Sequence, residues 1–304
     1  MKTTSARKLF ILGILSACIA LLPLVLGGCS GKPAAAIDGL EVRDTVNDYS
    51  WDELSRLSAA MHDTGSEDGA IALAKTYHLA KSNGKLDGTQ AKDLVLADGT
   101  TVQVQVAGFC HDDLTDGSKA GISFVFKDAI AVEPMYSPEA DSVNGWEQSS
   151  MRAWLNDEWM ANLPQDLQDV IVPASKYSNN VGETQDLACV TPTSDKLWLL
   201  SNIELEGKVD FEKARKAYED IWNAEGSQYQ IYDDIGIAWM APSKSSIKNL
   251  LTPDSSVDGG KPCGWWLRTS CPDDAGKFRR VGEDGTLGKA NAGQNAGVAP
   301  GFCL

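Results

Sequence analysis

The amino-acid sequence predicts an α+β fold: a mixed, mainly antiparallel sheet with flanking helices, preceded by a small helical N-terminal segment. Three observations carry this prediction. Apolar residues recur at helical spacing in several stretches, apolar and polar residues alternate in a hairpin, and short apolar runs separated by turn residues occupy the C-terminal end. A parallel, doubly wound sheet would contradict this fold class.

The N-terminus has the layout of a secretory signal peptide over residues 1–28. Basic residues and no acidic ones precede an apolar run from Leu9 to Leu26. The run ends in Leu26-Gly27-Gly28-Cys29, which resembles the lipobox of bacterial lipoproteins. The resemblance implies a diacylglycerol thioether on Cys29, cleavage before that residue and acylation of the new amine.

The alternative interpretation of this run is an uncleaved transmembrane helix, since it is about long enough to span a bilayer. Pro23 and the Gly27-Gly28 pair disfavour a continuous helix. We therefore expect a lipid-anchored chain on the bacterial cell membrane, facing the extracytoplasmic side. Several acyl chains on one cysteine hold a protein stably on a membrane.

The composition excludes one class of partner. Cleavage removes three of the 27 basic residues and none of the 42 acidic ones, so the mature chain carries a net charge near −18. A chain this acidic is not expected to bind nucleic acid, which requires clustered Lys and Arg. It is not expected to adsorb to anionic lipid either, so the lipid on Cys29 must provide the anchoring.

The mature chain is expected to have three parts. Residues 29–48 form a lipidated tether, residues 49–90 a helical N-terminal segment, and residues 91–304 a globular domain. Ser50-Trp51-Asp52-Glu53 is a capping box that opens a helix to about Met61, and Ser66 to Ala80 is predicted to form a second helix. These two helices are expected to lie outside the main core.

The globular part shows both periodicities. Asp98-Gly99 suits a tight turn between the apolar arm Leu94–Leu96 and the strictly alternating arm Val102–Val106, and this hairpin is expected to pack near the last strand. Further strands are predicted over residues 122–126, 197–200, 265–268, 278–281 and 298–304. Helices are predicted over residues 145–162, from Pro164 onward and over residues 211–224.

Five cysteines remain after the signal and the anchor: Cys110, Cys189, Cys263, Cys271 and Cys303. An odd number leaves at least one thiol outside any intrachain disulfide. Cys263 and Cys271 are close enough for a local bridge. No pair has metal-ligand spacing, so we expect neither a metal site nor a cofactor, and no catalytic residue is assigned.

Two polar segments are candidate functional sites. The stretch from Cys110 to Gly117 has some ligand positions of a calcium loop and a possible Cys–His pair, but it lacks the other calcium ligands, and a solvated turn is the preferred interpretation. In the strand Trp265–Arg268, Trp266 and Arg268 form a candidate ligand platform. The alternative is a core strand with a buried Trp.

Several motifs together resemble the DUF6273 family of exported bacterial domains, whose function is unknown. They are Val104-Gln105-Val106 with Gly108-Phe109 and His111-Asp112, Gly121–Phe124, Gly145-Trp146-Glu147, Arg152–Asn156, Leu163-Pro164, Ser194–Ser201, Glu225–Tyr229, Trp265–Arg268 and Gly297–Phe302. The resemblance covers roughly residues 90–304 and implies no particular chemistry.

The C-terminal end also resembles C-type-lectin-like folds, a superfamily that includes formylglycine-generating enzymes. The final strand has Ala299 where such folds have an Arg. The resemblance implies that loops 270–277 and 282–297, the latter including the small polar stretch 289–297, form a binding face. With Trp266 and Arg268, the predicted ligand-binding residues are Asp273, Asp274, Glu283, Asp284, Asn291, Gln294 and Asn295.

The function expected from these observations is a membrane-anchored surface lipoprotein that binds a glycan or a surface protein. Two alternatives stay open. One is a formylglycine-generating type of enzyme that uses Cys263 and Cys271, and the other is a structural spacer without a ligand.

Overall fold

The computed structural model describes residues 37–304 except 128, 138–143, 211–215, 240–253 and 256–260. The predicted signal peptide over residues 1–28 and the predicted lipidation site Cys29 lie outside the described residues. Among the helices of the described part, none is both long and apolar enough to cross a membrane.

The first sheet has five antiparallel strands and confirms the hairpin at Asp98-Gly99. Gly99 has a φ of 86°, which suits the left-handed geometry of this turn. The hairpin lies in the same sheet as the last strand, as expected. In spatial order, the strands are β1 (Ala91–Val95), β2 (Thr101–Phe109), β3 (Ile122–Phe126), β14 (Pro300–Cys303) and β7 (Trp198–Leu199).

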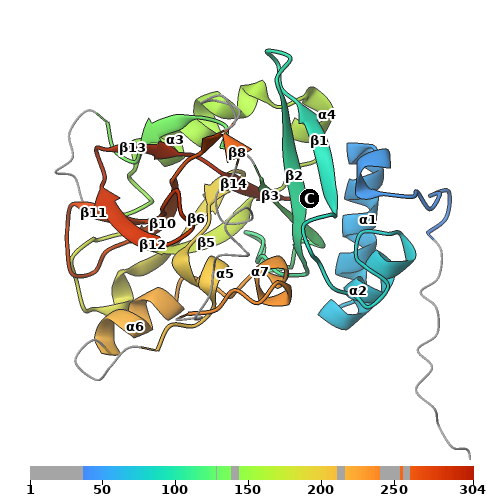
Figure 1. The fold of residues 1–304 in the computed structure, drawn as a ribbon. Coiled ribbons are helices and arrows are strands. Elements are labelled where there is room, and N and C mark those ends of the chain that lie inside the picture. The colour runs from blue at the N-terminus through green and yellow to red at the C-terminus, as the bar shows by residue number, and fades with distance from the viewer. Residues whose placement is uncertain (1–36, 128, 138–143, 211–215, 240–253, 256–260) are drawn as a thin grey trace, which may run out of the picture. The chain divides into compact units, whose positions relative to one another are not determined.

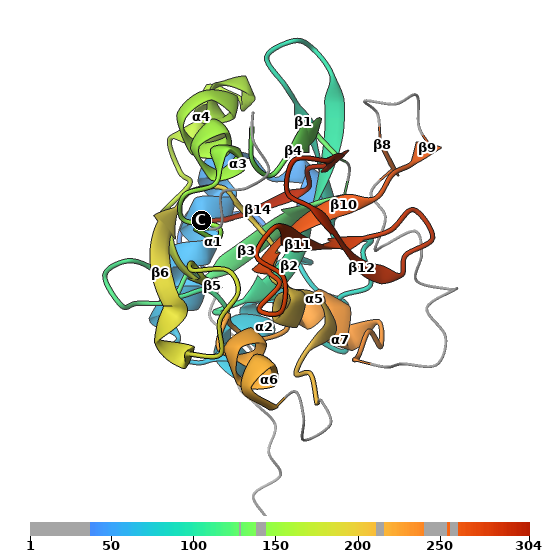
Figure 2. The ribbon, with the colours of Figure 1, turned by 90° about the vertical axis from the view of Figure 1, so that its left-hand side faces the viewer.

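The second sheet also has five strands, and one of its pairs, β10 with β13, is parallel. The two sheets and two further antiparallel ribbons confirm the predicted class, a mixed, mainly antiparallel α+β fold. The second sheet runs β12 (Leu287–Asn291), β11 (Lys277–Val281), β10 (Trp265–Ser270), β13 (Asn295–Gly297) and β4 (Val132–Pro134). The ribbons pair β5 (Ala174–Asn179) with β6 (Val190–Asp195), at the left of Figure 2, and β8 (Asp254–Ser255) with β9 (Lys261–Pro262).

The helices flank these sheets, and α5, α6 and α7 gather below β10–β12 in both views (Figure 1 and Figure 2). The α-helices are α1 (Trp51–Asp63), α2 (Glu67–Thr76), α3 (Ser150–Ala153), α4 (Gln165–Gln168), α5 (Asn202–Glu206), α6 (Lys216–Asn223) and α7 (Gln230–Asp234). After α3 the chain continues as a π-helix, η2 (Trp154–Glu158), and a 3₁₀-helix, η3 (Trp159–Asn162); η1 (Val46–Asp48) and η4 (Leu187–Cys189) are 3₁₀ turns. The first residues of the helix predicted over 211–224 lie outside the described part.

The prediction that the N-terminal helices lie outside the main core is wrong, because buried residues of both α1 and α2 belong to the same apolar core as the sheets. The Trp51 ring packs edge-on against Phe124 and Phe302 of the first sheet, with centroid separations of 5.7 and 5.9 Å. The hydroxyl of Ser58 accepts a hydrogen bond from the Ile122 amide and donates to the carbonyl of Leu304. The apolar face of α1 therefore covers the first sheet.

The backbone of α1 at Ser58 lies very close to the backbone at Gly121, just before β3. A Cβ at Gly121 would lie 1.9 Å from the carbonyl oxygen of Ser58. Since real Cβ atoms never come that close to backbone oxygen, a glycine is required at this crossing. Any larger residue at position 121 would push the helix off the sheet.

The prediction that residues 289–297 form a small polar loop is also wrong. Strands β12 and β13 occupy most of this stretch, and Lys289 pairs with Arg279 in the β11–β12 register. Ala290, Ala292 and Ala296 are buried, whereas the polar residues between them are exposed. The alternation of a strand is present, but its inward residues are small, and alanine is a weak strand signal.

Candidate functional site

The structure separates the predicted ligand-binding residues into four places. Trp266 and Arg268 are fully buried in β10, so the exposed platform predicted there is corrected in favour of the core-strand alternative. Asn291 and Gln294 lie at the turn between β12 and β13. Glu283, Asp284 and Asn295 line one cavity. Asp273 lines a different cavity, and Asp274 lies beside it.

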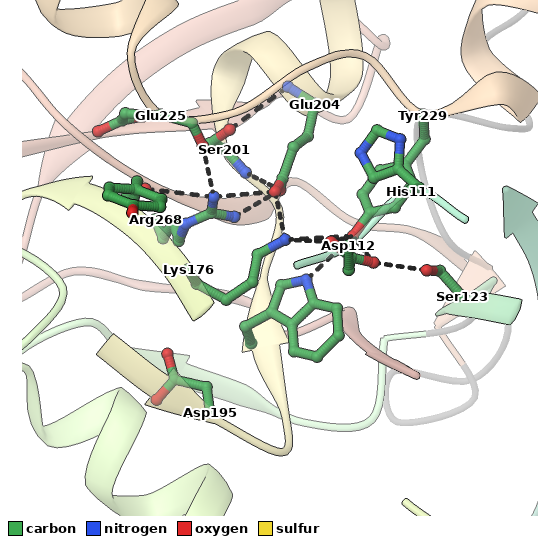
Figure 3. Close-up of polar contacts among 12 residues, drawn as sticks. His111, Asp112, Ser123, Lys176, Asp195, Ser201, Glu204, Glu225, Tyr229 and Arg268 are labelled. Carbon is green, nitrogen blue, oxygen red and sulfur yellow. Dashed lines mark hydrogen bonds and ion pairs between the residues drawn. The ribbon is translucent and has the colours of Figure 1, made fainter. Parts of the chain in front are cut away.

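Arg268 belongs to a buried group of charges that sequence reasoning did not find. We call it the core ion network; its members, each at most 4% exposed, are Asp112, Lys176, Glu204, Glu225, Tyr229 and Arg268. Figure 3 shows their side chains close together. They come from the loop after β2, from β5, α5 and β10, from the segment after α6 and from the N-cap of α7. The network therefore joins elements that are distant in the sequence.

Glu204 is the central carboxylate of the core ion network. Arg268 binds it with both terminal nitrogens, at 2.5 and 2.9 Å, and Lys176 Nζ lies 2.5 Å from Glu204 Oε1. Burial acts to raise the pKa of Glu204, but the charges of Arg268 and Lys176 outweigh it and hold the pKa below its ordinary value. Glu204 also completes the capping box with Ser201 at the start of α5.

Asp112 is the second carboxylate, and its position corrects the solvated turn expected at this residue. Lys176 Nζ lies 2.6 Å from Asp112 Oδ1, the Ser123 hydroxyl donates to Oδ2 at 2.5 Å, and the Tyr229 hydroxyl lies 3.0 Å from both oxygens. Desolvation opposes ionisation, but Lys176 keeps the pKa of Asp112 well below its ordinary value. The following residues, from Asp113 to Lys119, do form the expected exposed turn.

Glu225 balances the charge of the network. Burial, partly opposed by Arg268, raises the pKa of Glu225 to about 7. The carboxyl contacts the Thr269 hydroxyl and accepts the Asn179 amide at 3.0 Å. With Glu225 protonated, the two cations Lys176 and Arg268 face two carboxylates, and no net charge is left buried.

The core ion network fits a structural role better than a catalytic one. Its carboxylates are shielded from solvent, and the His111 ring stacks on Tyr229 with 4.1 Å between centroids. Burial lowers the pKa of His111 and raises that of the neighbouring Cys110 thiol, which is the opposite of what a nucleophilic thiolate requires. Within the described ranges, no group of three or more His, Cys, Asp or Glu side chains is arranged to hold a metal ion.

A cavity of about 630 Å³ at the end of the second sheet is the better candidate for ligand binding. We call it the sheet-end cavity. It is lined by Val132, Cys263, Gly264, Arg280, Gly282, Glu283, Asp284, Thr286, Asn295, Ala296 and Gly297. Three of the residues predicted from sequence thus meet in one cavity, together with an arginine that was not predicted.

Three polar side chains of the sheet-end cavity are open to a ligand. Across the part of the chain that the structure describes, the side chains of Arg280, Glu283 and Asn295 form no hydrogen bond or ion pair. Asp284, by contrast, accepts from the amide and the hydroxyl of Thr286, at 3.0 and 2.6 Å, and so holds the turn before β12. The cavity therefore combines a fixed turn with a guanidinium, a carboxylate and an amide.

The cysteines give no support to the enzyme alternative. Cys271 is a buried thiol that forms no disulfide, and burial raises its pKa to about 12. Cys263 lines the sheet-end cavity, whereas Cys271 lines a different one. Among the described residues, the two sulfurs therefore line different cavities and do not face a common one.

The comparisons with known proteins gave one match. A family model described as a domain of unknown function (DUF6273) matches residues 120–304, which is more than half of the chain. The matched range begins later than residue 90, so the motif from Val104 to Asp112 lies outside it. No curated protein and no solved structure matches the chain.

Proposed function

This chain belongs to the DUF6273 family, and we propose that it is a membrane-anchored surface lipoprotein whose globular part binds a glycan through the sheet-end cavity. The family name carries no activity, so the proposal rests on the residues of this chain. It has two parts, the anchor and the binding site, and each can fail without the other.

The anchor rests on the sequence before the described residues. A basic start, an apolar run and the ending Leu26-Gly27-Gly28-Cys29 together favour lipidation on Cys29 and display on the extracytoplasmic face of a bacterial membrane. Cys29→Ser is expected to leave an unlipidated, unprocessed precursor, detected by metabolic labelling with a fatty acid. A mature, labelled Cys29→Ser protein would refute the anchor.

The single observation that carries the binding site is that Arg280, Glu283 and Asn295 meet in one cavity and form no side-chain hydrogen bond or ion pair with the described residues. A carboxylate accepts hydrogen bonds, a guanidinium donates them and an amide does both. Sugar hydroxyls need this mixture, because each donates and accepts. The cavity also lies where the lectin-like resemblance places a binding face, at the connections between the last strands.

A glycan is preferred to a protein ligand because the cavity is concave and polar. Its lining combines several glycines with charged and amide side chains, whereas protein interfaces are usually centred on aromatic anchors. Such a polar site gives modest affinity for one sugar unit, so dense display on a membrane would strengthen binding through multivalency.

The test is a glycan array probed with the wild-type chain and with Arg280→Gln, Glu283→Gln and Asn295→Ala. The matched control is Asn291→Ala, an exposed asparagine of the neighbouring strand that does not line the cavity. We expect the three cavity variants to lose the wild-type signal and the control to keep it. A wild-type chain that binds no glycan, or cavity variants that bind as wild type does, would refute the proposal.

A further inference from the structure

A second cavity lies on the other face of β11. Arg279 and Arg280 are consecutive in that strand, and consecutive strand residues point to opposite faces of a sheet. Arg280 lines the sheet-end cavity, whereas Arg279 lines a cavity of about 140 Å³ beside α6. We call the latter the Arg279 cavity; its lining is Tyr218, Trp222, Cys271, Pro272, Asp273, Arg279 and Lys289.

The guanidinium of Arg279 is held in a fixed orientation. Its Nε donates to Asn202 Oδ1 at 3.1 Å, and its central carbon lies 4.9 Å from the centroid of the Trp222 ring. These two contacts fix the plane of the guanidinium from one edge and one face. A guanidinium oriented in this way loses little conformational freedom when a ligand binds.

The two terminal nitrogens of the same guanidinium are available as hydrogen-bond donors. Among the residues that the structure describes, none accepts a hydrogen bond from its terminal nitrogens or pairs with it as an anion. The amide nitrogen of Asn202 is buried beside it and also lacks an acceptor there. Asn202 Nδ2 is a buried donor without an acceptor, which is unfavourable, and the partly exposed guanidinium of Arg279 presents its terminal nitrogens beside it, so acceptor oxygens of a ligand would fit here.

The charges around the cavity limit what those oxygens can belong to. Lys289 Nζ lies 3.5 Å from Asp273 Oδ1, so these two lining residues largely neutralise each other. Arg279 is the charge of the lining that forms no ion pair with the described residues, although Asp273 and the buried carboxylate of Glu206 act on it electrostatically. A single negative charge fits beside it, whereas a dianion would meet stronger repulsion from Asp273 and Glu206.

We propose that the Arg279 cavity is a second ligand site, which binds the carboxylate of a small monocarboxylate. The two terminal nitrogens of Arg279 match the two carboxylate oxygens as a parallel pair of hydrogen bonds. Tyr218 and Trp222 supply an aromatic wall for the carbon skeleton of the ligand. Either a sugar acid or the C-terminus of a short peptide would supply this chemistry.

The experiment is isothermal titration calorimetry on the full chain in detergent. The probes are glucuronate and N-acetylglycine, each with its neutral counterpart, glucose or N-acetylglycinamide, and inorganic phosphate. We expect one or both carboxylates to bind and their neutral counterparts not to bind. The carboxylate that binds more tightly identifies the source of the ligand.

The variants Arg279→Gln, Arg279→Lys and Arg280→Gln locate the site. We expect Arg279→Gln to weaken carboxylate binding about tenfold or more, Arg279→Lys to weaken it less, and Arg280→Gln to leave it unchanged. Arg280→Gln should abolish only the glycan binding proposed for the sheet-end cavity, so the two proposals fail separately.

Three results would overturn this second site: no carboxylate binds the wild-type chain, phosphate binds more tightly than either carboxylate, or Arg279→Gln binds as the wild type does. The comparison of charged and neutral probes on the wild-type chain needs no variant. It therefore decides the question even if Arg279→Gln does not fold.

Discussion

Two arginines on neighbouring strands have opposite surroundings. Arg268 on β10 is fully buried, binds Glu204 with two nitrogens and donates further hydrogen bonds to Ser178 Oγ and to the carbonyl of Leu199. Arg280 on β11 has a side chain without any such contact in the described part of the chain. The first arginine is satisfied by the fold, and the second is left for a ligand.

This difference shows which charges of the molecule serve stability and which serve binding. A buried pair such as Arg268 with Glu204 gains little over a well-packed apolar pair, but losing one partner leaves a charge in a medium of low polarity. Replacing an arginine outside such a network changes the free energy of unfolding little. The account therefore predicts large effects on stability from the core ion network and small ones from the sheet-end cavity.

The largest effect is expected for Arg268→Met. The change removes the bidentate partner of Glu204 and leaves that buried carboxylate with Lys176 alone, so unfolding free energy should fall by about 3–5 kcal/mol. Urea denaturation measures this. Arg280→Met is the matched control and should change stability by less than about 0.5 kcal/mol. Equal effects of the two changes would show that the core ion network is not what distinguishes them.

The pH dependence of the unfolding free energy tests the role of Glu225. Its folded pKa of about 7 lies above its ordinary value of 4.5, so the folded state favours the protonated carboxyl. The favourable contribution is complete below pH 4.5 and is lost as the pH rises to about 7, by about 3 kcal/mol. Glu225→Gln, which stays neutral, should remove this loss.

Denaturation curves of wild type and Glu225→Gln across this range give the measurement. The pKa values of Asp112 and Glu204 lie below their ordinary ones, so these residues stabilise the fold throughout this range and lose their contribution only in stronger acid. Their effect therefore does not overlap the window of Glu225. A constant difference between the two proteins from pH 4.5 to pH 7 would disprove a titrating Glu225.

A smaller effect is expected where α1 meets the first sheet. Ser58→Ala removes the hydroxyl that joins the Ile122 amide to the Leu304 carbonyl, and should lower the free energy of unfolding by about 1–3 kcal/mol. Ser55→Ala, on the same helix and without a side-chain hydrogen bond in the described residues, is the control. If both variants unfold alike, the contact between α1 and the sheet is not supported by Ser58.

Much of the fold could be predicted from local patterns. The strict alternation after Asp98-Gly99 and the capping box at Ser50 predicted the place of β2 and the start of α1, whereas β1 begins at Ala91, before the predicted arm Leu94–Leu96. What failed depended on tertiary packing. β12 and β13 were missed because their inward residues are alanines, which are a weak strand signal. The packing of α1 on a strand near the other end of the chain has no signal in the local sequence.

The site was only partly predictable for a similar reason. Glu283, Asp284 and Asn295 follow from their place between the last strands, which is a sequence property. The core ion network joins partners 64 residues apart, Asp112 with Lys176 and Glu204 with Arg268, and no spacing rule connects them. One signal was available: a charged residue inside the apolar strand Trp265–Ser270 implies a buried partner.

The central claim is that the sheet-end cavity binds and the core ion network only stabilises. It is tested most directly by measuring glycan binding and unfolding free energy on the same preparation of Arg280→Gln. We expect glycan binding to be lost while the unfolding free energy stays within about 0.5 kcal/mol of wild type. Glycan binding that persists in a folded Arg280→Gln chain would contradict it.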